Sequence, residues 1–451
     1  MTEIVILAAG EGKRMNSAQP KVLQPVGGRP MIRHLIASAR SLGPELLRVV
    51  IGSGADAIRA ELAAEGCRFV VQGERLGTGH AALQALPDID PNERVLILPG
   101  DMPLIRPQTL ERLLSCPADL AVLSFQADDP TGYGRILRDD RGGVTAIREQ
   151  RDASLAEQAV CEVNSGVMCA RAADWLTWLD QVGADNAQGE YYLTDCIAVA
   201  VAAGRSVEAV VADDANELLG ANDRAQLAQL ESVFQHRARG DLMAAGVTLT
   251  APATVQVRGA VQCGRDVVID ANVILEGQVC LGEGVVISQG CVVRDCELAA
   301  GTRLEPYCVL ESVRTTGACT IGPFARLRPG TELAAGVKIG NFVEVKKARF
   351  EAGAKASHLS YVGDAVVGER ANLGAGTITC NYDGVNKHRT EIGADAFVGS
   401  NTALVAPVRV GEGATIGAGS VIGKNAPDAQ LTLTRSPQRT IRGWQRPAKK
   451  D

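Results

Sequence analysis

The stretch from Glu391 to Gly423, E-I-G-A-D-A-F-V-G-S-N-T-A-L-V-A-P-V-R-V-G-E-G-A-T-I-G-A-G-S-V-I-G, carries an aliphatic residue at every sixth position. These residues are Ile392, Val398, Leu404, Val410, Ile416 and Ile422. Neither the 3.6-residue period of a helix nor the alternation of a strand produces a period of six. A solenoid does, because each six-residue unit can form one flat side of a triangular coil with its aliphatic residue inward. We therefore predict a parallel β-helix.

The same period extends back to about residue 265 in three further ladders. They are Ile269, Leu275, Leu281, Ile287, Val293, then Leu298, Leu304, Leu310, then Ile321, Leu327, Leu333, Ile339, Val345. Glycine often follows the aliphatic residue, as at Gly340 and Gly399, and a small residue there would help the chain to turn a corner.

The ladder is interrupted twice. The register is lost between Lys346 and Val366, and the separation from Thr379 to Ile392 is thirteen residues, one more than two repeats. Because insertions in a solenoid become loops, often on the binding face, we predict a loop at each interruption. The first contains His358, and the second contains His388, for which an exposed position without a catalytic role is expected.

The first half of the chain alternates between strand-like and helix-like segments. Ile4–Leu7, Leu47–Ile51 and Val95–Leu98 are typical of strands, and 33–42 has helical periodicity. This alternation predicts an α/β, doubly wound parallel sheet. Ligands bind such sheets at the carboxyl ends of the strands, which is where Ala8-Ala9-Gly10 and Pro99-Gly100-Asp101 lie.

The length of 451 residues exceeds what a single core usually serves, so several domains are expected. The polar, helix-prone segment 224–245 is predicted to be a linker helix. It separates a first domain at 1–223 from a β-helix domain with a C-terminal tail at 246–451. The basic tail after Arg435 is either solvated or part of a site for a phosphorylated cofactor.

Composition excludes several classes of function. The net charge of −6 argues against a broad nucleic-acid or anionic-membrane surface. The longest apolar run, 197–203, is far shorter than the ~20 residues that span a bilayer, and the first ten residues do not form a signal peptide. The twelve cysteines form no C-x-x-C pair or Cys/His cluster, so buried reduced thiols in a cytoplasmic protein are expected. Those in the repeat are Cys263, Cys280, Cys291, Cys308 and Cys319.

The first strand continues into L-A-A-G-E-G-K-R-M, Leu7 to Met15, followed by P-K-V-L, Pro20 to Leu23. Glycines let the backbone approach phosphate closely, and consecutive amides form an anion-binding nest. Arg14 and Lys21 would neutralise a triphosphate. The pattern resembles the sugar-phosphate nucleotidyltransferases, which make an NDP-sugar from an NTP and a sugar 1-phosphate.

Further motifs are similar to one branch, the bifunctional N-acetylglucosamine-1-phosphate uridyltransferases and glucosamine-1-phosphate N-acetyltransferases, along nearly the whole chain. The motifs are Q-x(4)-G-T-G-H at 72–80, G-D at 100–101, D-D-P-T-G-Y-G-R-I at 128–136, V-N-S-G at 163–166 and G-A-N-D-R at 220–224. The resemblance implies that Asp101 and Asn222 hold Mg²⁺, which prefers oxygen ligands. It also implies substrate binding by Leu7, Ala8, Ala9, Gly10, Arg14, Lys21, Gln72, Gly77, Thr78, Gly100, Gly134, Glu149 and Asn164, while His80 has no required role.

The repeat region carries a second set of motifs, I-G-P-F-A-R-L-R-P-G at 321–330, G-N-F-V-E-V-K-K at 340–347 and S-H-L-S-Y-V-G-D at 357–364. These repeats resemble the hexapeptide-repeat acyltransferases, which form left-handed β-helices and usually homotrimers. The resemblance implies that Arg328 and Lys346 clamp a sugar phosphate and that Tyr361 and Asn372 hold the sugar. Acetyl-CoA would contact Ala375, Asn381, Tyr382, Ser400, Ala418 and Arg435.

His358 is the predicted catalytic base. Acetylation of an amine needs a group that removes the ammonium proton near neutral pH, and histidine suits this task. The resemblance assigns the same residue. A purely structural coil would require none of His358, Arg328 or Lys346.

The leading interpretation is a bifunctional enzyme that acetylates glucosamine 1-phosphate with acetyl-CoA and then transfers uridylyl from UTP to N-acetylglucosamine 1-phosphate. The resemblance implies a bacterial cytoplasmic role, with UDP-N-acetylglucosamine supplied to the cell wall and lipopolysaccharide. One alternative keeps only the nucleotidyltransferase and makes the β-helix a structural or regulatory module. A non-catalytic binding protein is disfavoured by the intact Lys21, Asp101 and Asn222.

Overall fold

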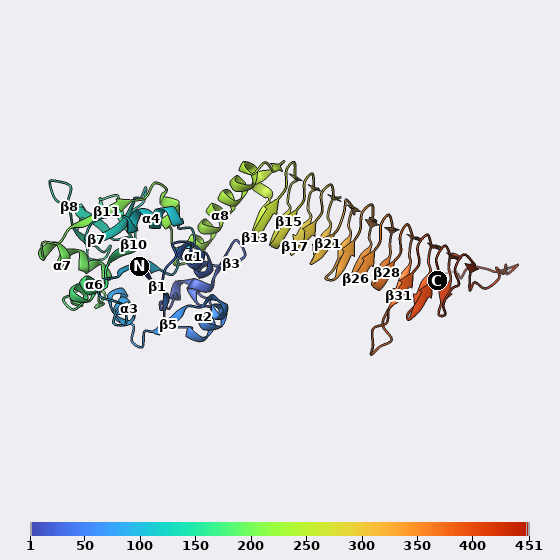
Figure 1. The fold of residues 1–451 in the computed structure, drawn as a ribbon, viewed down its shortest axis with the longest axis horizontal. Coiled ribbons are helices and arrows are strands. Elements are labelled where there is room, and N and C mark those ends of the chain that lie inside the picture. The colour runs from blue at the N-terminus through green and yellow to red at the C-terminus, as the bar shows by residue number, and fades with distance from the viewer. Residues whose placement is uncertain (1, 448, 450–451) are drawn as a thin grey trace. The chain divides into compact units, whose positions relative to one another are not determined.

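The computed structural model describes residues 2–447 and 449, which divide into two compact units, one up to Gln235 and one from His236 onward (Figure 1). The division lies inside α8 (Arg224–Ala244), the helix expected at 224–245. Within the described residues, no helix is long and apolar enough to cross a membrane.

The first unit is built on a nine-stranded sheet whose main path runs β11-β7-β10-β6-β1-β4-β5. These strands are β1 (Thr2–Leu7), β4 (Leu47–Ile51), β5 (Arg68–Val71), β6 (Arg94–Pro99), β7 (Leu120–Gln126), β10 (Glu162–Arg171) and β11 (Val207–Val211). In addition, β8 (Arg135–Arg138) pairs with β10, and β9 (Val144–Arg148) pairs with β8. The chain runs from β1 to β4 and β5 on one side and then returns to β6 on the other. The strand order therefore reverses between β1 and β6, the position at which α/β sheets bind ligands.

Helices cover both faces of this sheet because successive side chains of each strand point to opposite faces. Ile4 and Ile6 belong to one buried cluster and Val5 to another. The first cluster includes α1 (Met31–Arg40), α2 (Ala55–Glu61) and α4 (Pro107–Leu114), and the second includes α3 (Thr78–Ala85), α6 (Ala172–Leu179) and α7 (Cys196–Ala202).

The sheet is mixed, whereas the alternation of strands and helices predicted a parallel one. β10 runs antiparallel to both β6 and β7. It is reached through the β8–β9 hairpin and the short α5 (Leu155–Gln158), so the crossover helix that a parallel neighbour needs is missing from this connection.

The second unit is the predicted parallel β-helix, with strands of successive coils paired in parallel (Figure 1). One side of the coil is an eleven-stranded sheet made of β12 (Thr248–Leu249), β14 (Val268–Ile269), β16 (Val286–Ile287), β19 (Arg303–Leu304), β22 (Thr320–Ile321), β25 (Lys338–Asn341), β27 (Lys355–His358), β29 (Asn372–Leu373), β32 (Phe397–Val398), β35 (Thr415–Ile416) and β37 (Leu431–Thr432).

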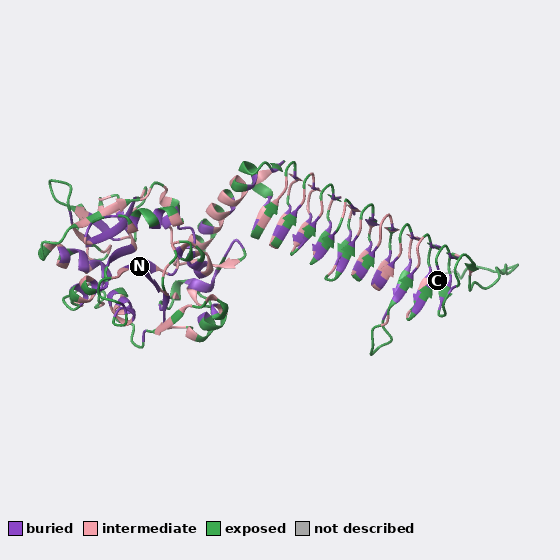
Figure 2. Ribbon diagram, in the orientation of Figure 1, coloured by how far each residue is buried: buried purple, intermediate pink, exposed green. Residues whose placement is uncertain are grey.

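The other sides join in a fifteen-stranded sheet. It contains β13 (Gln256–Cys263), β15 (Ile274–Leu281), β17 (Val292–Arg294), β18 (Glu297–Leu298), β20 (Val309–Glu311), β21 (Val313–Thr315), β23 (Arg326–Leu327), β24 (Thr331–Leu333), β26 (Glu344–Phe350), β28 (Tyr361–Val367), β30 (Ile378–Cys380), β31 (Thr390–Ile392), β33 (Ala403–Val405), β34 (Val408–Val410) and β36 (Val421–Ile422). All the ladder residues quoted above are at most 3% exposed, and Figure 2 shows how buried and exposed positions alternate along the coil. Ala238 and Leu242 of α8 pack on the same core and cover its first coil.

One of the two predicted loops is absent, and the other is present. Between Lys346 and Val366 the coil continues, because Phe350, Ala356 and Val362 point inward at spacings of five or six residues. The large Phe350 and the small Ala356 replace the usual aliphatic residues, which hid the period. The segment 381–389 does leave the coil as a loop, closed by a bridge between Tyr382 and Lys387.

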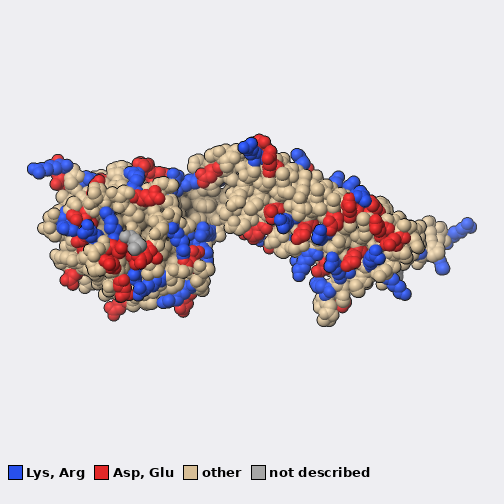
Figure 3. Space-filling view, in the orientation of Figure 1, with Lys and Arg blue, Asp and Glu red and all other residues tan. Residues whose placement is uncertain are grey.

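The cysteines are free thiols. Cys291, Cys308 and Cys319 are buried as expected, whereas Cys280 is exposed and Cys263 is partly so. Cys280 points outward because its neighbours Val279 and Leu281 take the inward positions of β15. On the face of the molecule drawn in Figure 3, positive and negative side chains are interspersed over both units.

Candidate active sites

The first unit holds a cavity of about 710 Å³ at the carboxyl ends of β1 and β6. Most of the residues predicted for uridylyl transfer line it, namely Leu7, Ala8, Ala9, Gly10, Lys21, Gln72, Gly77, Thr78, Asp101, Glu149 and Asn164. Gly100 packs beside this lining, where a Cβ would lie 2.8 Å from the carbonyl oxygen of Leu7. Arg14 is exposed, and Gly134 lies behind Glu149.

Three polar side chains converge at one end of the cavity. The Nζ of Lys21 lies 2.6 Å from Oδ2 of Asp101 and 3.1 Å from Oδ1 of Asn222. Asp101 follows β6, and Asn222 lies just before α8. The two oxygens therefore meet around a single position that already accepts a cation, the lysine ammonium.

A carboxylate oxygen and an amide oxygen are ligands suited to Mg²⁺. Within residues 2–447 and 449, no three His, Cys, Asp or Glu side chains cluster in a way that could hold a metal. A metal held by Asp101 and Asn222 would accordingly need further oxygens from nucleotide phosphate or water, as Mg²⁺ bound beside phosphates usually does.

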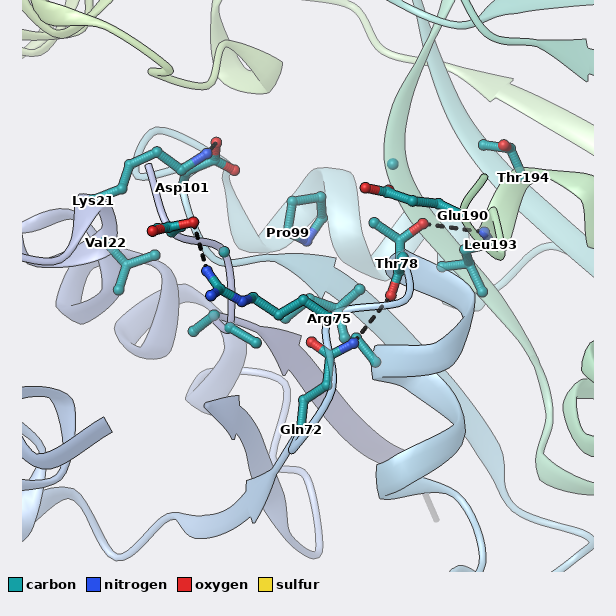
Figure 4. Close-up of a pocket in the computed structure, with 18 of the residues that line it drawn as sticks. Lys21, Val22, Gln72, Arg75, Thr78, Pro99, Asp101, Glu190, Leu193 and Thr194 are labelled. Atoms are coloured by element: carbon teal, nitrogen blue, oxygen red, sulfur yellow. Dashed lines mark hydrogen bonds and ion pairs between the residues drawn. The ribbon is translucent and has the colours of Figure 1, made fainter. Parts of the chain in front are cut away.

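The opposite end of the cavity is organised around Gln72 (Figure 4). Its Nε2 donates to the carbonyl oxygen of Gly77 at 3.2 Å and lies 3.1 Å from Nδ1 of His80. Thr78 Oγ1 accepts from the backbone N–H of Leu193 at 3.1 Å. His80 thus supports the orientation of Gln72, a role that the sequence did not indicate.

The sugar-binding candidates meet through the backbone of β10. The N–H of Asn164 donates to the carbonyl oxygen of Gly134 at 2.8 Å, and Thr194 donates to Oε1 of Glu149 at 3.0 Å. Burial raises the pKa of the Glu149 carboxyl above its ordinary value. A buried carboxylate that lines a cavity can accept hydrogen bonds from sugar hydroxyls.

The cavity is also lined by charged residues to which the sequence analysis assigned no role. Arg75 extends from the side of Gln72 toward the loop that follows β1 (Figure 4), and its Nη1 lies 2.7 Å from Oε2 of Glu11 in that loop. Lys13 lies 3.2 Å from the same oxygen. The negative charge that Glu11 brings to the predicted phosphate site is therefore balanced by two cations.

In the second unit, His358 lies at one corner of the coil. The residue after each such corner position has a left-handed backbone, as at Phe342, Leu359, Gly376, Asn401 and Gly419. The residues directly before them are Asn341, His358, Ala375, Ser400 and Ala418. Backbone hydrogen bonds join these five along one edge. Each left-handed residue donates its N–H to the carbonyl oxygen of the corner residue one coil earlier: Leu359 to Asn341, Gly376 to His358, Asn401 to Ala375 and Gly419 to Ser400.

The predicted base and three predicted acetyl-CoA residues therefore form one column across successive coils, which we call the His358 column. Its members after His358 are Ala375, Ser400 and Ala418. Their small side chains leave room along the edge. The side chain of exposed Arg435 lies at the same end of the coil, near Gly417 and Gly419.

The sugar-phosphate candidates lie on two different sheets. Nη1 of Arg328 is 2.9 Å from Oε1 of Glu344, which is in register with Tyr361. Lys346 follows on the same strand, β26. Asn372 belongs instead to the eleven-stranded sheet, in register with Lys355 and Phe397. One chain thus brings three of the four candidates to the same sheet.

The loop at 381–389 carries the remaining acetyl-CoA candidates. Nδ2 of Asn381 lies 2.5 Å from Oδ2 of Asp364, and exposed Tyr382 is covered by the ammonium of Lys387 at 4.1 Å. Nε2 of His388 lies 2.7 Å from Oδ2 of Asp383. His388 belongs to the loop, as expected, but it is only partly exposed. A backbone N–H from Asn386 and the His388 contact hold the pKa of Asp383 far below its usual range.

A second cavity of about 330 Å³ lies beside this loop. Its charged lining is mostly basic and consists of Lys347, Arg349, Lys387, His388, Arg389, Glu332 and Asp364. Sequence reasoning missed these cations because they come from the coil and the loop, which are adjacent only after folding.

Four bulky apolar residues occupy consecutive corners and form what we call the corner ladder: Tyr307, Phe324, Phe342 and Leu359. Their side chains are between 49% and 62% exposed. The rings of Tyr307 and Phe324 stack at 5.2 Å, and those of Phe324 and Phe342 stack at 5.4 Å. Their φ values lie between 50° and 61°, a region that bulky residues rarely adopt.

Comparison with known proteins matches both units. Residues 4–173 match the model of the MobA-like NTP transferase domain, and residues 389–424 match the bacterial transferase hexapeptide family with six repeats. The chain is 54% identical over 448 residues to the bifunctional protein GlmU of Alkalilimnicola ehrlichii, covering 99% of this chain and 97% of the relative. It is 54% identical to that of Azotobacter vinelandii and 52% identical to that of Aromatoleum aromaticum, with 99% of each chain covered.

Proposed function

Since this chain belongs to the family of bifunctional GlmU proteins, we propose how its two units divide the two reactions of that family. The chain is a uridylyltransferase and a glucosamine-1-phosphate acetyltransferase, and its product is a precursor of peptidoglycan. The assignment of residues rests on one observation, that each compact unit has its own predicted site, the cavity in the first and the His358 column in the second.

The first unit transfers uridylyl from UTP to N-acetylglucosamine 1-phosphate. The phosphate oxygen of the sugar attacks the α-phosphorus, the bond to the β-phosphate breaks, and pyrophosphate leaves. In such transfers, most of the rate acceleration comes from positioning of the reacting groups and from neutralisation of the phosphate charge. Lys21 and Arg14 neutralise phosphate, Gln72, Gly77 and Thr78 hold the base, and Gly134, Glu149 and Asn164 hold the sugar.

Asp101 and Asn222 would hold Mg²⁺, which supplies further neutralisation of the triphosphate. The convergence of their oxygens on the Lys21 ammonium supports a cation position there. With a cation held by Asp101 and Asn222, Lys21 would be released to pair with phosphate, so the lysine would have a partner in either case.

The second unit acetylates glucosamine 1-phosphate. His358 takes a proton from the ammonium group, and the amine nitrogen attacks the thioester carbonyl of acetyl-CoA. The carbon–sulfur bond then breaks, and the coenzyme leaves as its thiol. Acetyl-CoA lies along the His358 column, with Asn381, Tyr382 and Arg435 as polar contacts, while Arg328, Lys346, Tyr361 and Asn372 bind the sugar phosphate.

A purely structural coil is the alternative for the second unit. The packing of a β-helix needs inward aliphatic residues, and it does not need an exposed histidine followed by three small residues on one edge. The His358 column therefore favours the catalytic interpretation. Incubation with glucosamine 1-phosphate, acetyl-CoA, UTP and Mg²⁺, with each omitted in turn, tests it. Formation of UDP-N-acetylglucosamine only from pre-acetylated sugar would favour the structural coil.

The assembly is proposed to be a homotrimer. Exposed aromatic residues in left-handed conformations destabilise a protein through backbone strain and through the exposure of apolar surface to water. Burial of the corner ladder against further copies of the chain removes the exposure of apolar surface. A closed cyclic assembly buries every copy of such an interface. Such packing also places a second copy beside His358, because Leu359 belongs to the ladder.

Light scattering tests the trimer. We expect Phe324→Glu to dissociate the assembly, while uridylyl transfer stays unchanged. The exposed Val385 in the loop provides a control, since Val385→Glu adds the same charge away from the ladder. A monomeric wild-type protein that still acetylates would contradict the proposal. The proposed location is the cytoplasm, where UTP and acetyl-CoA are available.

A further inference from the structure

The side chain of Asn341 is hydrogen-bonded to the proposed base, His358. Asn341 ends β25, and His358 ends β27, the next strand of the same sheet, with the two residues in register. Nδ1 of His358 lies 2.9 Å from Oδ1 of Asn341, the distance of a good hydrogen bond. Asn341 is half-buried, whereas His358 is exposed.

The chemistry of the two groups defines the direction of this bond. An amide oxygen only accepts hydrogen bonds, so Nδ1 must carry the proton. In a neutral imidazole the other nitrogen, Nε2, then has a free lone pair. An exposed histidine without this partner could exchange tautomers and rotate about its side-chain bonds.

We infer that Asn341 is a positioning residue for acetyl transfer, whose side-chain oxygen holds Nδ1–H of His358 and keeps Nε2 free to accept the proton of the substrate amine. This inference rests on the proposed role of His358 as the base. Asn341 does not touch the reacting atoms and acts through the imidazole.

The backbone around the pair is tightly packed, which keeps the two side chains at a constant separation. A Cβ on Gly340 would lie 1.9 Å from the carbonyl oxygen of Ser357, so only glycine allows the two coils to approach so closely. Both residues are followed by left-handed corner residues, Phe342 and Leu359. The hydrogen bond is therefore supported by its surroundings, as an oriented base requires.

Asn341 is not one of a row of amide side chains that stabilises the same corner in every coil. The residues that follow His358 in its column are Ala375, Ser400 and Ala418, none of which has an amide side chain. In an earlier coil, Gln289 takes the same position, directly before the left-handed residue Gly290. The corresponding residue of the next coil is Pro306, so neither an amide nor a histidine lies opposite Gln289. Gln289 therefore offers a control at the same position of the coil without a histidine opposite.

The test compares Asn341→Ala, Asn341→Asp and Gln289→Ala in the full-length protein. We expect Asn341→Ala to lower kcat of acetyl transfer roughly tenfold or more, which is less than the about 10²–10⁴-fold contribution of a general base. The KM values for both substrates should stay within about twofold, since binding contacts are untouched. Gln289→Ala should acetylate normally, and uridylyl transfer should be normal in all three variants.

Asn341→Asp separates positioning from packing. A carboxylate accepts the same Nδ1–H, so kcat at high pH should return to within about threefold of the wild type. The added negative charge favours the protonated imidazole, and the acid limb of the pH–rate profile should therefore move to higher pH. A residue that only stabilised the coil would not displace that limb.

Nitrogen NMR of ¹⁵N-histidine-labelled protein reads the tautomer directly, with His358→Ala identifying the signals among the five histidines. We expect the Nδ1–H form in the wild type and a shift toward Nε2–H in Asn341→Ala. The inference is overturned if Asn341→Ala has a wild-type rate and pH profile, or if both activities fall together. Full acetyl transfer by His358→Ala would instead refute the proposed base.

Discussion

At the scale of single residues, Glu149 combines a cost in stability with a proposed function in sugar binding. Burial raises the pKa of its carboxyl, so the folded state disfavours the charged form. We expect Glu149→Gln to raise the midpoint of thermal unfolding of the first unit by about 1–4 °C at neutral pH. Glutamine keeps an oxygen that accepts from Thr194 but would lose the charge-assisted hydrogen bonds proposed between Glu149 and the sugar. The KM for N-acetylglucosamine 1-phosphate should rise about 10–100-fold.

The pH dependence of that stability gain has a defined sign. A carboxyl with a raised pKa binds more protons in the folded state than in the unfolded state, so stability falls as pH rises through the interval between the two pKa values. The gain from Glu149→Gln should therefore be smallest below pH 4.5, the ordinary value, and largest above the raised value. Calorimetry across pH measures it. Exposed Glu45→Gln is the control, and an equal gain at every pH would contradict burial as the cause.

Asp101 is the second residue at which a substitution is decisive. Asp101→Ala removes the proposed metal ligand and also the partner of Lys21, 2.6 Å away. We expect uridylyl transfer to fall by at least about 10³-fold, because charge neutralisation dominates phosphoryl-type transfer. Acetyl transfer should stay near normal. Asp213→Ala removes an exposed carboxylate and serves as the control, while full uridylyl activity of Asp101→Ala would remove Asp101 from the site.

At the scale of elements, the stacking of coils depends on glycines that follow the ladder residues. A Cβ on Gly340 would lie 1.9 Å from Ser357, and one on Gly399 would lie 2.5 Å from the backbone nitrogen of Ala418. These glycines are required for close approach between coils, whereas the sequence suggested a role in turning corners. The corners themselves accept Tyr307 and Phe324, which no propensity would predict there.

Gly340→Ala should therefore push apart the two strands that carry Asn341 and His358. Overpacking of this kind costs about 1–3 kcal/mol, and displacement of a catalytic group by about 1 Å costs up to about 10²-fold in rate. We expect acetyl transfer to fall at least tenfold, with uridylyl transfer unchanged. Gly423→Ala, where a Cβ meets open space, is the control. Equal behaviour of the two variants would contradict the stacking argument.

Much of each element was predictable from the sequence, because inward positions repeat at fixed spacing and phosphate-binding loops follow strands. The strand at 47–51 agrees with β4, and the helix expected at 224–245 is α8. The continuity of the coil through Ala356 was not predictable from a period of aliphatic residues. The partnership of Asn341 with His358 was also missed, since it depends on a coil of seventeen residues that brings the two into register.

At the scale of the whole molecule, the two activities should be separable, since each proposed site lies within its own compact unit. His358→Ala should lower acetyl transfer by about 10²–10⁴-fold, the usual contribution of a general base. Uridylyl transfer from supplied N-acetylglucosamine 1-phosphate should stay within about twofold, because distant sites respond independently. The residual acetyl rate should rise with pH as hydroxide deprotonates the amine.

Two outcomes of that experiment would contradict the separation. Acetylation by His358→Ala at the wild-type rate would assign the base to another group, and Tyr361 would be tested next. A parallel loss of both activities would make His358 a structural residue. Assays of both reactions on one preparation distinguish these outcomes.

Among the described residues, a helix covers only one end of the β-helix, and this has a consequence for how the coil unfolds. Each inner coil pairs with two neighbours, whereas an end coil pairs with one, and α8 covers only the first end through Ala238 and Leu242. The last paired strand, β37, contains the exposed Leu431 and is followed by the exposed Leu433. Local unfolding should therefore begin at this end and proceed coil by coil toward α8. Gentle heating should therefore loosen Ala418 and Ser400, two of the proposed acetyl-CoA contacts, while the coil that carries His358 is still ordered.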